Sequence, residues 1–324
     1  MGQSENATGT PYQPAFIQLP PLYAWPPRLL GSLRYLLVDM LFPWGLAYLV
    51  LAVFIWRYLT PDPVVMSTFS PGWLGFLWLR NCISLLLVAG GLHWWFYIRK
   101  AQQRQYKFHA KWLASNSRKF LWGSQVKDNM FWSIVSGVTV WTGFEAVSYW
   151  FYATSRVTAP DSVVWFVVSF YLLFFWSTGN FYLVHRILHI KPVYDHVHEL
   201  HHRNVNVGPW SGIAMHPVEH LFYFSPFALW WIVPVHPVII VLTGLYQAIY
   251  PAFSHSGFDY LRLPFGLRIS AGDWFHQLHH QYFNLNFGNT PTPLDHLFGS
   301  WHDGSAESLE HQKQLMRERR AGSS

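Results

Sequence analysis

The sequence predicts an all-α integral membrane protein with about four transmembrane helices, a membrane hairpin and a cytoplasmic, histidine-rich helical cap. Hydrophobic residues make up 51% of the chain and charged residues only 12%, whereas soluble domains carry about 25% charged residues. Long apolar stretches precede a segment that holds most of the histidines. The 19 Trp and 17 Tyr residues fit this class, because both rings favour the membrane–water interface.

Four regions follow one another along the chain. Residues 1–32 are rich in proline, so we expect an N-terminal arm that is flexible or lies on the surface. Residues 33–184 are expected to hold the transmembrane helices. Residues 185–302 would form the catalytic region, and residues 303–324 a charged tail that forms a frayed helix.

The transmembrane helices are predicted from four apolar stretches, at 35–59, 73–98, 130–154 and 162–184. Each approaches or exceeds the roughly 20 residues that span a bilayer as a helix. The second and third stretches contain Arg80 and Glu145. Charged residues at membrane depth usually face the protein interior and pair, so we expect a structural ion pair.

The orientation follows from the loop 99–128, whose only acid is Asp128. Its eight basic residues are Arg99, Lys100, Arg104, Lys107, Lys111, Arg118, Lys119 and Lys127. Cytoplasmic loops carry an excess of Lys and Arg. Counting spans from this loop places the N-terminus and the residues after 184 in the cytoplasm. Residues 221–252 form a further apolar region interrupted by prolines, which predicts two spans or a hairpin that returns to the cytoplasm. The endoplasmic reticulum and the bacterial inner membrane both fit this topology.

Two features limit the possible functions. The net charge is +6, but the basic residues lie beside apolar spans, so membrane topology explains them better than nucleic-acid binding. The single cysteine, Cys82, excludes an internal disulfide and a cysteine-based metal site. Any metal ion must therefore be held by histidines and carboxylates.

Fifteen of the 18 histidines fall between residues 185 and 302, and their spacing is regular. Two HxxHH triplets and an upstream HxxxH pair place histidines three or four residues apart, which is one face of a helix. We therefore expect each short helical stretch to direct its imidazoles toward one point. The candidate metal ligands are His185, His189, His198, His201, His202, His216, His220, His255, His276, His279 and His280.

The number of histidines indicates the kind of metal site. One zinc ion takes four ligands, so eight to ten clustered histidines suit two ions. Zinc has no redox chemistry, although it could replace the native metal in a purified protein. A metal transporter would place histidines inside the spans, where there are few. A membrane zinc hydrolase would leave the second triplet unexplained.

These motifs resemble the fatty acid hydroxylase/sterol desaturase superfamily of membrane di-iron enzymes. The resemblance covers about residues 130–302. It includes the HxxxH pair, both triplets, His216-Pro217-x-Glu219 and the His255-Ser-Gly turn. It ends with Asn286-Phe-Gly and Asp295-x-x-Phe-Gly-Ser.

The resemblance implies two Fe ions, O₂ as oxidant and an electron donor of the cytochrome b5 or ferredoxin type. It implies hydroxylation or desaturation of a lipid. The HPxE and HSG elements look more like the branch that acts on sterols or related isoprenoids. The alternative is a hydroxylase of fatty-acyl chains or sphingolipids.

Three acidic residues lie close to the candidate ligands in the sequence. Glu199 and Glu219 are expected to accept the outer N–H of a ligating imidazole, which fixes the orientation of the ring. Asp295 is expected to close the cap by bonding to the backbone or to a ligand histidine. No catalytic residue is predicted beyond these and the metal ligands.

Overall fold

The computed structural model describes residues 12–154, 156 and 160–321, and this part of the chain is mostly helical. Its α-helices are α1 Leu29–Arg34, α2 Trp44–Tyr58, α3 Pro63–Met66, α4 Pro71–His93, α5 Gln125–Trp132, α6 Thr139–Ala153, α7 Val163–Leu188, α8 Lys191–Val193, α9 Glu199–His202, α10 Pro217–Tyr223, α11 Pro237–Gly244, α12 Tyr250–Ser254, α13 Trp274–Tyr282, α14 Leu294–Leu297 and α15 Ala306–Ala321.

Shorter elements connect or extend these helices. Five π-helical turns are Tyr35–Asp39, Trp94–Ile98, Ser133–Val138, Tyr194–His198 and Leu245–Ile249. The 3₁₀ turns are Pro21–Tyr23, Leu121–Gly123, Pro209–Ser211, Ser225–Trp231 and Pro264–Gly266. Strands β1 Tyr260–Arg262 and β2 Arg268–Ser270 pair antiparallel, with Leu261 opposite Ile269. This small hairpin is a departure from the all-α prediction. Pro264 and Gly266 at its tip are typical turn residues.

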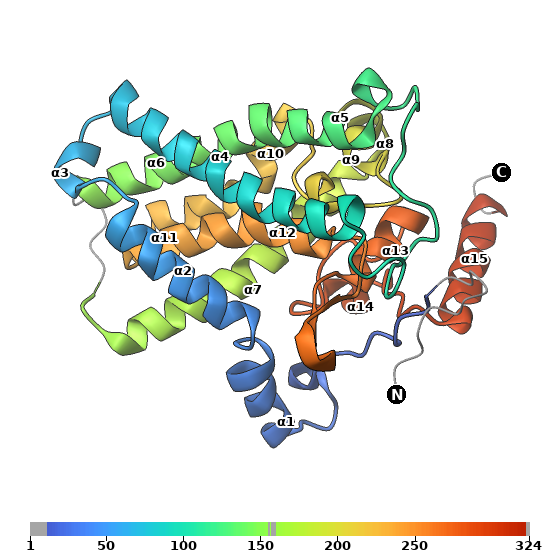
Figure 1. Ribbon diagram of the computed structural model, residues 1–324. Helices are drawn as coiled ribbons and strands as arrows, with labels where there is room; N and C mark the ends of the chain where they lie inside the picture. The colour runs from blue at the N-terminus through green and yellow to red at the C-terminus, as the bar shows by residue number, and fades with distance from the viewer. Residues whose placement is uncertain (1–11, 155, 157–159, 322–324) are drawn as a thin grey trace.

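The long helices lie roughly alongside one another, while α8, α9, α13 and α14 gather at one end of them (Figure 1). Three helical stretches are long and apolar enough to cross a membrane: Pro71–Ile98, Val163–Leu188 and Pro237–Ser254. The pair Leu29–Asp39 and Trp44–Tyr58, bent by 41°, would make a fourth if it counts as one span. The chain is thus a helical protein with three or four candidate spans.

The predicted span at 130–154 is helical but is not one of these candidates. It runs through α5, the π-turn Ser133–Val138 and α6. Its threonine, serine, tryptophan and tyrosine side chains, together with Glu145, lower its hydropathy. Of the described residues, Pro237–Ser254 instead joins the candidate spans, and most of its apolar window is buried inside the protein.

The apolar region 221–252 forms a helical hairpin. Its first arm consists of α10 and the turn Ser225–Trp231, and its second arm runs from α11 to α12. The tip reaches the first turn of α7, where the Trp165 indole N–H donates to the Pro234 carbonyl at 2.7 Å. The hairpin therefore extends along α7 to the end opposite the histidines, and only its second arm is a candidate span.

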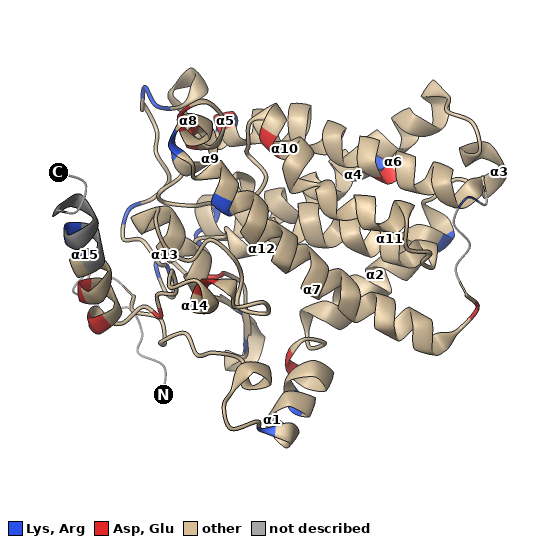
Figure 2. Cartoon of the chain, turned by 180° about the vertical axis from the view of Figure 1, so that it is seen from behind, with Lys and Arg blue, Asp and Glu red and all other residues tan. Residues whose placement is uncertain are grey.

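Charged side chains gather mainly at the histidine-rich end, while the long helices are almost free of them (Figure 2). The exception is the buried pair Arg80–Glu145, which joins α4 to α6 with 2.6 Å between Nη2 and Oε2. The predicted ion pair is therefore confirmed. Asn81 and Tyr149 complete it, because each donates a hydrogen bond to the Glu145 carboxylate.

The basic loop 99–128 packs on the histidine-rich region. Phe108 N–H donates to the Gly257 carbonyl, and the Gln125 side chain donates to the Asn206 carbonyl. Lys107 is almost fully buried, and its ammonium lies 5.6–5.9 Å from the centres of three aromatic rings. Its Nζ donates to the Asn206 side chain at 3.2 Å. The loop thereby holds the segments that follow His202 and His255.

The described part of the N-terminal arm lies on the same region. Tyr12 donates to Asp259, the Ile17 N–H to the Asp303 carbonyl, and Tyr23 to the Pro291 carbonyl. Residues 1–11 of the predicted arm and 322–324 of the predicted tail lie outside the described residues. The arm thus ties the chain after β1 to the segment that precedes α14.

Candidate metal centre

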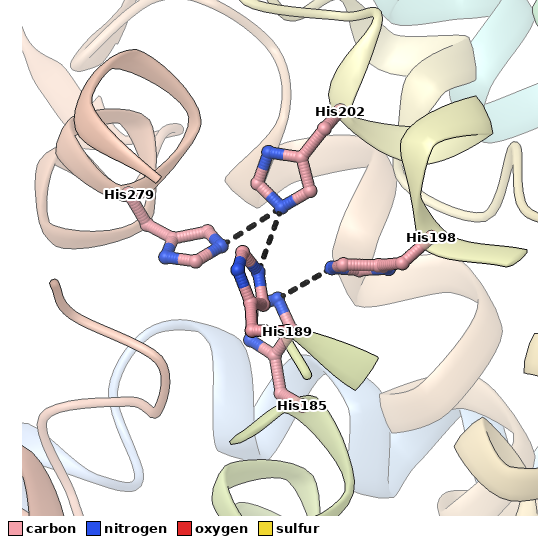
Figure 3. A group of neighbouring side chains, drawn as sticks. All are labelled: His185, His189, His198, His202 and His279. Atoms are coloured by element: carbon pink, nitrogen blue, oxygen red, sulfur yellow. Dashed lines mark hydrogen bonds between the residues drawn. The ribbon is translucent and has the colours of Figure 1, made fainter. Parts of the chain in front are cut away.

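The first of two histidine groups draws on four segments of the chain. Its members are His185, His189, His198, His202 and His279, and one ring nitrogen of each lies within 4.8 Å of all the others. The inward nitrogens are Nε2: His185 and His198 approach to 3.0 Å, His189 and His202 to 3.1 Å, and His202 and His279 to 3.0 Å (Figure 3).

The second group consists of His201, His255, His276 and His280, and all four are buried. His276 Nε2 lies 3.1 Å from Nε2 of His255 and 3.1 Å from Nε2 of His280. The two groups adjoin, since the His201 and His202 rings are 5.8 Å apart. Two metal-sized positions thus lie next to each other inside one helical assembly.

The two HxxHH triplets divide between the groups. Successive residues of an α-helix are about 100° apart around its axis, so His276 and His280 point almost the same way, while His279 points to another side. His276 and His280 accordingly join the second group and His279 the first. In the first triplet His198 and His202 join the first group and His201 the second. The expectation that each stretch points at one position was wrong for this reason.

Local structure sets the start of each histidine-bearing segment. The Asp273 side chain caps α13 by accepting the His276 N–H. The π-turn Tyr194–His198 leads into α9, so His198, His201 and His202 share a tightly wound segment. π-turns are frequent at functional sites. His185 lies in the last turn of α7 and His189 is the residue that ends this helix.

The outward ring nitrogens show why these residues fit metal ions. Nδ1 of His185 lies 2.6 Å from the Phe287 carbonyl, Nδ1 of His279 lies 2.6 Å from the Leu285 carbonyl, and Nδ1 of His198 lies 2.8 Å from Glu219 Oε1. An acceptor beside Nδ1 requires the proton there, so Nε2 of each ring presents a lone pair.

Lone pairs that face each other repel unless a cation lies between them. His185 and His198 place two such nitrogens 3.0 Å apart. Two nitrogens that each lie about 2.1 Å from one ion and at a right angle are about 3 Å apart. Neutral imidazole binds iron, copper, nickel and zinc. The donor set and its spacing therefore fit a transition-metal ion in each group.

Burial keeps the imidazoles neutral. It lowers the pKa of His201 to about 4 and the pKa of His189 to about 2, where the neighbouring His185 adds to the effect. Burial also lowers the pKa of His198, His202 and His276 well below the usual range. Neutral rings are the form that binds metal, because a protonated ring has no free lone pair.

The acidic residues differ in their roles. Glu219 accepts from His198, and burial raises the pKa of its carboxyl. Asp295 accepts from the N–H groups of Phe287 and Gly288 at 2.8 and 2.7 Å, and so fixes the carbonyl that meets His185. Glu199 is exposed, with its carboxylate 3.9 Å from Arg203. Among the described contacts it has none with a ring of either group.

Two candidate ligands lie outside both groups. His216 caps α10, because its Nδ1 accepts the Val218 N–H. His220 is buried, with Nδ1 2.9 Å from the Ser136 hydroxyl and Nε2 3.0 Å from the Ile213 carbonyl. Both of its nitrogens have protein partners, so it is not available as a ligand in this arrangement.

A cavity adjoins both groups on the side of the long helices. It encloses about 640 Å³ of empty space, part of it open to the outside, within the usual range for small-molecule sites. Its walls come from α7, α10 and the stretch from Leu245 to His255, and include histidines of both groups. The sequence analysis did not identify Ser177, Phe181 or Gln247 in its walls. The four-residue spacing of Ser177, Phe181 and His185 was the available signal.

The fold and the two groups define a class: helical membrane proteins with two buried, all-histidine metal positions. Residues 170–300 match the family model for fatty acid hydroxylase. We therefore place the chain in the fatty acid hydroxylase/sterol desaturase superfamily.

The chain is also similar to proteins named Delta(7)-sterol 5(6)-desaturase. It is 29% identical over 141 residues to the protein of Candida dubliniensis, 43% of this chain and 35% of that protein. It is 30% identical over 142 residues to the one of Eremothecium gossypii, 44% and 39% of the two chains. The chain thus spans less than half the length of these relatives. No solved structure matches it.

Proposed function

We propose that the protein is a membrane di-iron oxygenase that uses O₂ and external electrons to hydroxylate or desaturate a lipid. The observation that carries this proposal is the convergence of two groups of buried, neutral imidazoles at one cavity beside the candidate spans. The relatives favour a sterol or related isoprenoid as substrate over a fatty-acyl chain.

The ligand assignment follows the two groups. One iron would be held by His185, His189, His198, His202 and His279, and the other by His201, His255, His276 and His280. When bound, the iron pair supplies the electrons that reduce O₂ and the oxidising power that breaks an unactivated C–H bond. A single zinc ion, as in a hydrolase, would leave one group without a ligand.

The residues around the groups hold the rings and the substrate. Glu219 and the carbonyls of Phe287 and Leu285 fix three imidazoles through their outer nitrogens. Such partners keep a ligand's tautomer and orientation constant. The Phe181 ring lies 4.8 Å from His185 and 5.9 Å from His276. Phe181 therefore excludes water and confines the substrate carbon near the ring nitrogens.

The proposed orientation places the histidine-rich end in the cytoplasm. The concentration of Lys and Arg at this end supports it (Figure 2). Electrons would then arrive from a cytoplasmic donor of the cytochrome b5 or ferredoxin type. A protease-protection assay in which residues 190–210 are accessible only from the outside would contradict this orientation.

The test uses the full-length protein in its membrane. Cells that express it should contain a lipid whose mass differs from its precursor by one oxygen or two hydrogens, and the purified protein should hold two irons. The His185→Ala variant should lose the product while it remains in the membrane. His196→Ala is the matched control, because His196 is exposed and its Nδ1 meets only the Pro192 carbonyl. Full activity in His185→Ala would exclude this site.

A further inference from the structure

The cavity wall on α7 has three levels at helical spacing. Ser177, Phe181 and His185 follow one another four residues apart and all line the cavity. Each residue of an α-helix adds 1.5 Å along the axis, so Ser177 lies about 12 Å from the level of His185. The wall thus passes from a ligand histidine through an aromatic ring to a single hydroxyl.

The Ser177 hydroxyl has no hydrogen-bond partner among the described residues, although its side chain is 1% exposed. Serines and threonines inside helices usually bond to the carbonyl four residues earlier. Ser148 does so with Phe144 at 2.8 Å, and Thr178 does so with Phe174 at 2.9 Å. Ser177 therefore presents an unused donor and acceptor to the cavity.

Other polar groups of the cavity wall already have partners. Tyr223 donates to the Gln247 carbonyl, and the Gln247 amide donates to the Tyr223 carbonyl. Ser254 lies 3.0 Å from Nδ1 of His255 and donates to the Pro251 carbonyl. Leaving a buried hydroxyl unpaired costs stability, so the free hydroxyl at Ser177 indicates a partner that enters from outside the chain.

We propose that Ser177 is a specificity-determining residue that hydrogen-bonds to a hydroxyl or carbonyl oxygen of the bound lipid. This inference rests on the proposed function. The lipid it selects has an apolar body and one oxygen about 12 Å from the carbon that lies between the histidines. Phe181 and Tyr223, whose rings are 6.1 Å apart, confine the apolar part between these two points.

α7 also supplies a matched control. Ser169 lies two turns before Ser177 on the same helix, is fully buried, and likewise has no hydrogen-bond partner among the described residues. It is not one of the residues that line the cavity. A general effect of removing a serine from this helix would appear in Ser169→Ala, whereas loss of a ligand contact would appear only in Ser177→Ala.

The experiment measures equilibrium binding to the purified, iron-loaded protein with two pairs of radiolabelled lipids. One pair is cholestanol and cholestane, and the other is 1-hexadecanol and hexadecane; the members of each pair differ only in a hydroxyl. Wild type should bind the alcohol of at least one pair about threefold to tenfold more tightly than its hydrocarbon, as expected for one hydrogen bond. The pair that shows the preference identifies the shape of the apolar body.

Ser177→Ala should abolish this preference and Ser169→Ala should retain it. The inference is overturned if wild type shows no preference in either pair, or if Ser177→Ala keeps it. Iron content and oxidised product, measured on the same preparations, test the proposed function separately. Selective binding without product would contradict the oxygenase and leave the role of Ser177 intact.

Discussion

Two buried polar clusters in this chain differ in whether their own side chains satisfy them. In the cluster between α4 and α6, Arg80 pairs with Glu145, and Asn81 and Tyr149 occupy the remaining carboxylate positions. In the histidine groups the outer nitrogens have partners, but the inner nitrogens face one another. The first cluster is complete without a ligand, whereas the second needs a cation. This difference separates a structural polar cluster from a binding site.

The largest effect is expected when a histidine of one group is removed. His279→Ala should reduce the iron content from two toward one per chain and abolish activity, because His279 belongs to the first group alone. The loss should exceed the 10- to 100-fold typical of residues that only orient a ligand. Metal analysis of the purified variant measures it. His311→Ala is the control, since His311 is exposed on α15. Two irons in His279→Ala would refute the ligand assignment.

Removing one partner of the Arg80–Glu145 pair tests the other side of the comparison. Glu145→Leu should destabilise the protein by about 3–5 kcal/mol, because it leaves a buried guanidinium without its counter-charge. The double variant Arg80→Met/Glu145→Leu should recover much of this loss. Denaturant unfolding in micelles measures both effects. Iron content per folded chain should stay unchanged, and a selective loss of iron would show that the cluster serves the site.

The Glu219 carboxylate lies between the two kinds of cluster, because it is a protein partner of a candidate ligand. Glu219→Ala removes the acceptor at 2.8 Å from His198 Nδ1. Iron affinity, measured by competition with a chelator, should fall about 10- to 100-fold. Glu199→Ala is the matched control, because Glu199 is exposed beside Arg203. Equal affinities in the two variants would contradict the orienting role of Glu219.

Lys107 provides the smallest effect and a pH dependence. Burial lowers its pKa to about 7, while an unfolded lysine has a pKa near 10.4. Between these values the unfolded chain binds the proton that the folded chain has released, so the contribution of Lys107 to stability rises with pH from about 7 to about 10. Lys107→Met should remove this rise, which is at most a few kcal/mol. Thermal unfolding of both proteins at pH 7 and pH 9 gives the comparison.

The sequence predicts the composition of the site better than its geometry. Nine of the 11 candidate histidines lie in the two groups, because three- and four-residue spacing on short helices brings imidazoles together. The division of each triplet between two positions depends on rotation about the helix axis. Periodicity alone does not show that a residue between two ligands points elsewhere.

His220 and Glu145 show where tertiary contacts decide. The pairing of Glu145 with Arg80 was predictable, because a charge in an apolar stretch needs a partner. The capture of His220 by Ser136 and Ile213 was not, since these residues lie 84 and seven positions away and carry no pattern. The span at 130–154 was overestimated because its aromatic residues are amphipathic and its Thr and Ser residues bond within the helix.

One continuous helix, α7, both passes along the cavity as a candidate span and carries His185 in its last turn. Helices in bilayers tilt to match the thickness of the hydrocarbon layer. A thicker or thinner membrane would therefore turn α7 as a lever and shift His185 relative to the Phe287 carbonyl, which belongs to a distant part of the chain. Catalytic competence in this protein should thus respond to the lipid composition around it, even where no lipid is consumed.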